Sequence, residues 1–139
     1  MDDRINNICS LFYASHYIPL AVYEERTIVH IFSSAGSNLD LFSSFEAQSF
    51  SVEQTMYILT LPEQGMYGQI RIKNSPMRLL LGPVFPTPIT EDTVMTVARR
   101  NLTDKKDMDA LAEFLYSIPN CSYNQFVNLT ALLNFIING

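Results

Sequence analysis

The sequence predicts an α+β domain, with a five-stranded antiparallel sheet, one N-terminal helix and three C-terminal helices. Three observations point to this class. The chain opens with an amphipathic segment, continues through five short β-forming runs separated by turn residues, and has helical periodicity in its last third. One sheet with helices packed over it is a common layered solution for burying a single core.

Residues 3–16 are expected to form the first helix. Asp2 or Asp3 supplies an N-cap, and Pro19 prevents the helix from continuing. Apolar side chains recur at the i, i+3, i+4, i+7 spacing of a buried helix face, at Ile5, Ile8, Cys9 and Phe12.

Five strands are expected after this helix. Polar turn residues at 24–26, 62–65 and 73–76 separate most of them, and such tight turns favour antiparallel pairing of consecutive strands. Residues 39–50 mix apolar residues with serines and are expected to form a short helix or an irregular linker. The strands are predicted at residues 20–23, 27–32, 54–61, 67–72 and 77–84.

Three helices are expected in the last third. Thr90 caps the first, which runs to Arg99 or Arg100, and Thr103 or Asp104 caps the second, which ends before Pro119. The third begins at a capping box formed by Ser122 and Gln125 and continues to the end of the sequence. The buried face of the second helix is predicted to consist of Met108, Leu111, Ala112 and Leu115.

This order of elements has the general plan of the PAS/GAF-like sensor fold. A chain of 139 residues fits one domain. We expect residues 1–119 to form its body and residues 120–139 to form a C-terminal dimerisation or transmitter helix.

Composition excludes several functions. The net charge is −5 and the nine basic residues are scattered, so this segment is not expected to bind nucleic acid itself. No glycine-rich phosphate loop is present, and neither His16 nor His30 belongs to a triad or a metal set. Cys9 and Cys121 are expected to be reduced and buried, although a disulfide between them is an alternative. The sequence thus predicts a cytoplasmic protein that is not an enzyme, with no cofactor, metal or membrane span.

The last helix carries an apolar seam. Phe126, Leu129, Leu133 and Ile136 follow the alternating spacing of three and four that is typical of a coiled coil, and Leu132 widens the stripe. They form the predicted dimer or transmitter surface, and a homodimer is the expected assembly. Packing of the same stripe on the protein's own sheet is an equal alternative. The seam consists of Phe126, Leu129, Leu132, Leu133 and Ile136.

A ligand site is expected on one face of the sheet, since sensor pockets are apolar with a few polar groups and lie between a sheet and its cover. Alternation places Tyr67, Gln69 and Arg71 on one face of their strand, and Tyr57 lies in the preceding strand. The Arg71 guanidinium suits a carboxylate or phosphate, but a solvent-facing Arg71 is the alternative. The identity of a small-molecule ligand is not readable from these residues.

Several segments resemble the N-terminal regulatory region of AraC-type transcriptional regulators of Gram-positive bacteria. They are ICSLFY (8–13), IPL (18–20), YGQI (67–70), LLLGPV (79–84), PTPIT (86–90), YSIP (116–119) and QFVNLTALLNFIING (125–139). The similarity is loose in residues 33–60.

The resemblance implies a signal-sensing or dimerisation domain coupled to two helix-turn-helix units, which these 139 residues do not contain. DNA would then be bound only through that further domain. The helical last third and the two histidines do not fit the cupin barrel of the sugar-sensing members. The alternative function is a sensor domain of a signalling kinase or another two-component protein.

Overall fold

The computed structural model describes residues 3–25, 27–33, 54–61, 65–100 and 103–139, and it confirms the predicted α+β class. The segment at 39–50, for which a short helix or linker is expected, lies outside these residues. The described elements are α1 (Asp3–His16), β1 (Leu20–Glu24), β2 (Thr27–Phe32), β3 (Met56–Leu61), β4 (Gly65–Arg71), β5 (Met77–Val84), α2 (Glu91–Arg100), the 3₁₀ turn η2 (Lys105–Asp107), α3 (Met108–Ser117) and α4 (Tyr123–Asn138).

The five described strands form one antiparallel sheet in the order β2-β1-β5-β4-β3. Consecutive pairing is confirmed for β1 with β2 and for β3 through β5. The β1–β2 pair and the β3–β4–β5 group form one sheet because β1 pairs with β5, with Leu20 opposite Leu81. β5 is therefore the central strand, which agrees with its nearly continuous apolar sequence.

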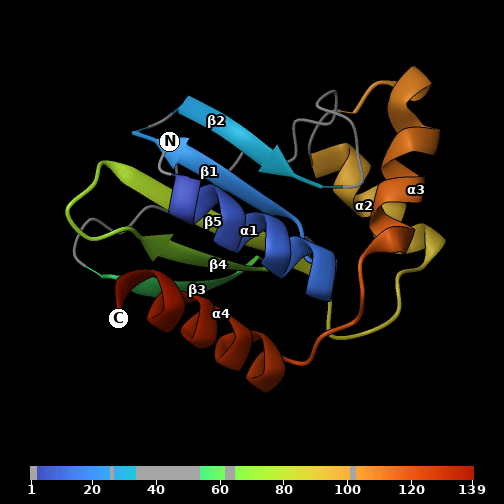
Figure 1. Cartoon of the computed structure of the whole chain (residues 1–139). Coiled ribbons are helices and arrows are strands. Elements are labelled where there is room, and N and C mark those ends of the chain that lie inside the picture. Colours follow the sequence, from blue (N-terminus) through green and yellow to red (C-terminus); the bar gives the residue numbers. More distant parts are fainter. Residues whose placement is uncertain (1–2, 26, 34–53, 62–64, 101–102) are drawn as a thin grey trace.

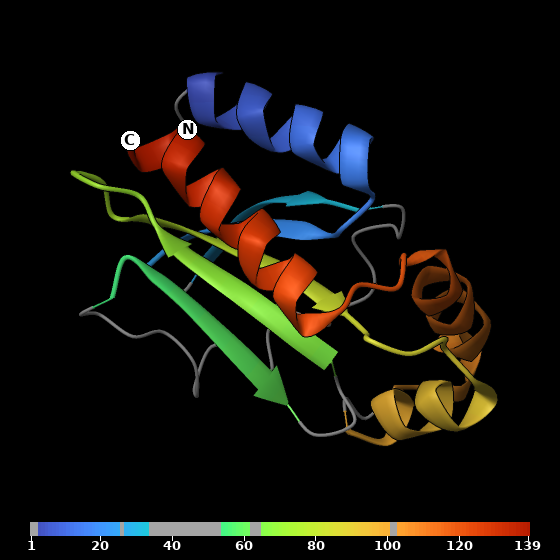
Figure 2. The ribbon, with the colours of Figure 1, turned by 90° about the horizontal axis from the view of Figure 1, so that it is seen from below.

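Helices α1 and α4 lie side by side over one face of the sheet, whereas α2 and α3 pack at one end of it (Figures 1 and 2). The main core lies under these helices and contains Cys9, Leu79 and Phe126. A second, smaller cluster lies on the opposite face and is built from Ala21, Tyr23, Tyr67 and Leu80. No described helix covers that second face.

Helix α4 approaches β4 closely because Gly68 has no side chain. A Cβ at Gly68 would lie 2.6 Å from the Thr130 hydroxyl oxygen and 2.9 Å from the Thr130 methyl carbon. Thr130 is fully buried, and its hydroxyl donates to the Phe126 carbonyl at 2.9 Å. Thr130 is not one of the predicted seam residues, and it is buried because the missing Cβ at Gly68 makes room for a polar side chain that bonds to its own helix.

The helix ends follow the predictions with one correction. The capping box of α4 is confirmed, because the Gln125 amide donates to the Ser122 hydroxyl at 3.2 Å and the Ser122 amide donates to the Gln125 side chain at 3.1 Å. The Asp104 side chain makes no capping bond, and the chain enters α3 through η2 instead. Leu111 and Leu115 are buried in α3 as expected, and Phe114 joins them.

Candidate functional site

The four predicted ligand-binding residues lie on the same face of the sheet, the one opposite α1 and α4. Tyr67, Gln69 and Arg71 alternate along β4 with Gly68 and Ile70, and these two face α4 and the main core. Tyr57 of β3 is the register partner of Gln69. The structure therefore brings the predicted residues together, and we call this surface the Gln69 face.

Gln69 lies in the middle of this face with its polar atoms unpaired. Its side chain is only 3% exposed, and neither its amide nitrogen nor its amide oxygen has a hydrogen-bond partner. On either side of it in the sheet are Tyr57 and Leu80. Leaving a buried donor or acceptor unsatisfied costs about 1–3 kcal/mol, so such a group in a folded protein requires an explanation.

Tyrosines give the Gln69 face an apolar and aromatic character. Tyr67 and Tyr23 are both buried, and Tyr57 is half-buried. Burial, and to a lesser extent the neighbouring Tyr23, raises the pKa of Tyr67 far above its usual range. Its phenol is therefore neutral at physiological pH and remains a hydrogen-bonding group rather than an anion.

Positive charge lies at one end of the same face. Arg71 of β4 and Arg78 of β5 are register partners, and Tyr23 is the partner of Arg78 on the other side. Both arginines are half-buried, on the face of the sheet that no described helix covers. Two guanidinium groups therefore lie on neighbouring strands at this end of the face.

The predicted seam of α4 is divided between the protein's own core and its surface. Phe126 and Leu133 are fully buried against the sheet, and Leu129 is partly buried on the same core. Leu132 and Ile136 are exposed, with 50% and 43% of their surface accessible. The core side of the stripe therefore cannot meet a second subunit without unfolding, whereas its outer edge is accessible.

The C-terminal end of α4 is tied to both neighbouring elements, which sequence reasoning did not predict. Arg4 of α1 donates to the Ile136 carbonyl at 2.7 Å, where a cation also suits the negative end of the helix dipole. The Asn138 side chain donates to the Arg71 carbonyl and accepts from the Lys73 amide, each at 2.9 Å. The strand that carries Gln69 therefore holds the last turn of α4.

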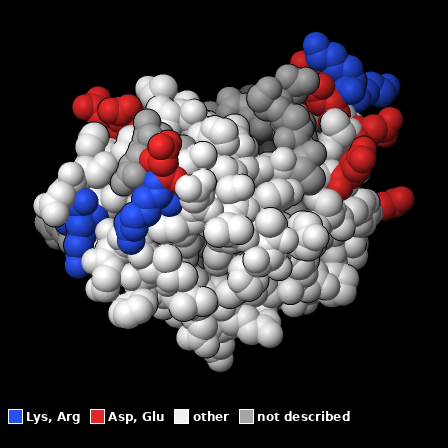
Figure 3. All heavy atoms as spheres, in the orientation of Figure 1, with Lys and Arg blue, Asp and Glu red and all other residues white. Residues whose placement is uncertain are grey.

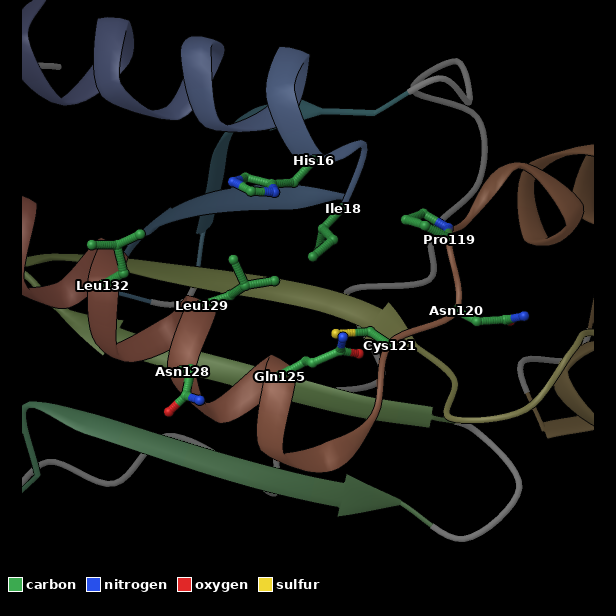
Figure 4. A pocket seen from close by; sticks show the side chains of 9 residues that line it. All are labelled: His16, Ile18, Pro119, Asn120, Cys121, Gln125, Asn128, Leu129 and Leu132. Atoms are coloured by element: carbon green, nitrogen blue, oxygen red, sulfur yellow. The ribbon is translucent and has the colours of Figure 1, made fainter.

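A groove of about 450 Å³ lies between the end of α1 and α4 (Figure 4). His16 faces it from α1, and Leu129 and Leu132 face it from α4. The His16 ring also packs on Phe12, with ring centroids 4.7 Å apart. The walls of the groove are largely apolar.

The two cysteine thiols are poorly suited to nucleophilic chemistry. Cys9 and Cys121 are both buried and free, as the preferred interpretation predicts. Burial raises the pKa of the Cys9 thiol to about 12 and also raises the pKa of Cys121, which keeps both thiols protonated and weakly nucleophilic. In the described ranges, no three His, Cys, Asp or Glu side chains gather into a group that could hold a metal ion. None of the described helices combines the length and apolar character that crossing a bilayer requires.

Charged residues lie around the margin of the surface that α1 and α4 form. In the orientation of Figure 1, the central area of this surface shows no charged side chain (Figure 3). Exposed apolar side chains on these two helices include Leu11, at 69% exposed, and Phe135, at 68%. The surface is thus uncharged and partly apolar on a chain whose net charge is −5.

The described residues thus include an unpaired carboxamide on one sheet face and an uncharged helical surface on the other. Comparison of the chain with protein-family models, with curated proteins and with solved structures found no match.

Proposed function

We propose that this chain is a signal-sensing domain that binds a small molecule on the Gln69 face and transmits binding to α4. The observation that carries the proposal is the buried, unpaired carboxamide of Gln69 among tyrosines. A group of this kind is destabilising until something pairs with it, so a binding partner gains the free energy that the free protein lacks.

Strand β4 supplies the route from the site to the helix. Its odd-numbered residues, Tyr67, Gln69 and Arg71, form the binding face, while Gly68 packs against α4 on the other side. The Arg71 carbonyl accepts from Asn138 in the last turn of α4. A change of twist or position in β4 on ligand binding therefore alters contacts of α4 directly, because packed elements move as units.

The resemblance to AraC-type regulators indicates which domain would receive the signal from α4. In that setting α4 would lead to a helix-turn-helix DNA-binding domain, and the PAS/GAF-like plan of one sheet face covered by helices suits a cytoplasmic sensor. In the alternative, α4 would transmit ligand binding to the catalytic part of a signalling kinase. In a gene product that extends past Gly139, paired helix-turn-helix patterns with a basic face support the first, and a kinase module supports the second.

Native mass spectrometry of protein purified from cells without denaturation tests the binding function. We expect a bound small molecule on the wild-type chain and its loss from Gln69→Met, which keeps the side-chain volume and removes both polar atoms. Gln54→Met is the matched control, because Gln54 is exposed. A wild-type chain that carries no molecule and takes up none from a cell extract would contradict the proposal.

A second function, homodimerisation, is favoured by the surface that α1 and α4 form. Two acidic chains repel each other, so an uncharged surface is where a second copy can dock at least cost. Phe135 and Leu132 are exposed there and are large enough to contribute to an interface.

Sedimentation velocity distinguishes this interface from the core side of α4. Phe135→Glu and Leu132→Glu are expected to give folded monomers, whereas Leu133→Glu unfolds the domain because Leu133 is fully buried. Thr87→Glu, at an exposed position outside α4, is the control for added charge. A wild-type chain that stays monomeric at high concentration rules out self-association.

A further inference from the structure

We infer that the Gln69 face takes an uncharged, planar molecule whose hydrogen-bond donor and acceptor are adjacent, as in the N–H and C=O edge of a lactam or imide. The inference rests on the proposed binding function and names the ligand class of the same site.

The chemistry of the carboxamide selects this class. The Gln69 oxygen accepts and its nitrogen donates, and neither atom has a partner within the protein. An anion pairs with the nitrogen alone, and a cation pairs with the oxygen alone, so each leaves one buried polar atom unsatisfied. A molecule with an adjacent N–H and C=O satisfies both atoms through two parallel hydrogen bonds.

The surroundings favour a neutral ligand. Gln69 is flanked across the sheet by Tyr57 and Leu80, and along its own strand by the buried Tyr67. A charge placed here would lose its hydration, and the guanidinium groups of Arg71 and Arg78 lie one row further along the face rather than against the Gln69 carboxamide. The same burial that raises the pKa of the Tyr67 phenol also penalises an ionised ligand beside it.

The aromatic surroundings also favour a flat ligand. Aromatic side chains provide faces and edges on which a planar ring packs well.

Isothermal titration calorimetry with 2-pyridone tests the inference, since this small ring is planar, neutral and carries the required N–H and C=O edge. The first control ligand is N-methyl-2-pyridone, which keeps the ring and the carbonyl but has no donor. The second is benzoate, a planar anion. The Gln69→Met and Gln54→Met proteins are titrated in parallel, with their folding checked by circular dichroism, and Gln69→Leu serves as a second variant at the site.

We expect 2-pyridone to bind the wild-type chain roughly tenfold more tightly than N-methyl-2-pyridone, the factor for one buried hydrogen bond. This preference should disappear in Gln69→Met and persist in Gln54→Met. Benzoate binding that depends on Gln69 would overturn the ligand class but leave the proposed binding site standing. If no ligand binds in a Gln69-dependent way and the chain from cells carries no small molecule, both the class and the proposed function are wrong.

Discussion

Replacing Gly68 with alanine tests how closely α4 is packed on the strand that carries the candidate site. The new Cβ would lie 2.6 Å and 2.9 Å from two atoms of Thr130, closer than non-bonded atoms tolerate. Thr130 is β-branched, fully buried and hydrogen-bonded to its own helix, so its side chain cannot turn away without breaking that bond. The strain must therefore be relieved by movement of α4 or β4.

The expected loss of stability follows from two opposing effects. Overpacking a close-packed core costs about 1–3 kcal/mol. Replacing a glycine by alanine restricts the unfolded chain and returns about 0.4–1 kcal/mol. We therefore expect Gly68→Ala to lower the free energy of unfolding by about 1–2 kcal/mol. Urea unfolding followed by far-UV circular dichroism measures it, because the chain contains no tryptophan.

A double-mutant cycle identifies Thr130 as the source of the strain. Thr130→Ala removes both atoms that the new Cβ would meet, and on its own it costs about 1–2 kcal/mol through the cavity it leaves. The double variant should be more stable than the sum of the single effects by at least about 1 kcal/mol. Gly68→Ala combined with Leu132→Ala, at an exposed position of the same helix, should be additive. Additivity with Thr130→Ala would refute the proposed contact.

Three further outcomes follow from the structure. Gln69→Met should raise the free energy of unfolding of the ligand-free protein by about 1–2 kcal/mol in urea, because it removes two unsatisfied polar atoms, while Gln54→Met should have little effect. An unchanged or lower stability of Gln69→Met would show that Gln69 is already paired. Ser122→Ala should cost about 1 kcal/mol by removing the capping box of α4, and Ser122→Thr should retain most of that stability, so equal losses in the two variants would contradict the capping role. Burial raises the pKa of the Cys9 thiol from 9.0 to about 12, so above about pH 9 the unfolded chain loses this proton first and stability falls as the pH rises towards about 12. Cys9→Ala should flatten this fall in urea midpoints above about pH 9 and leave the midpoints below that pH on the same slope. An identical slope above about pH 9 would rule out Cys9 as its source.

The parts of the fold that the sequence predicted are those encoded by local patterns. Helical spacing identified the buried residues Cys9 and Leu111, and the Ser122–Gln125 box is complete within four consecutive residues. Strand alternation placed Tyr67, Gln69 and Arg71 on one face, since the side-chain period of a strand does not depend on its neighbours.

The parts that were missed depend on contacts between distant segments. The burial of Thr130 is explained by Gly68, which lies in another element and has no side chain to suggest a partner. The ties from Arg4 and Asn138 to the last turn of α4 and to β4 join opposite ends of the chain. The apolar seam of α4 likewise does not reveal what it packs against. Only the three-dimensional structure shows which of its residues face the sheet and which face the surface.

The burial of Gln69 is the most informative departure from expectation. Strand alternation predicted its face but not that both amide atoms would be buried without partners. In most soluble proteins a glutamine on an open sheet face is solvated. Its polar amide is buried among tyrosines without a hydrogen-bond partner, and this makes Gln69 a candidate binding residue.

The most direct test of this account is a titration of the protein with 2-pyridone, followed through the side-chain amide resonances of Gln69 and Asn138 in ¹H–¹⁵N spectra. Gln69 reports the binding face, and Asn138 reports the end of α4 that β4 holds. We expect both resonances to shift saturably with the same midpoint. An unshifted Gln69 would contradict the assigned site, and a shifted Gln69 with an unchanged Asn138 would contradict transmission through β4.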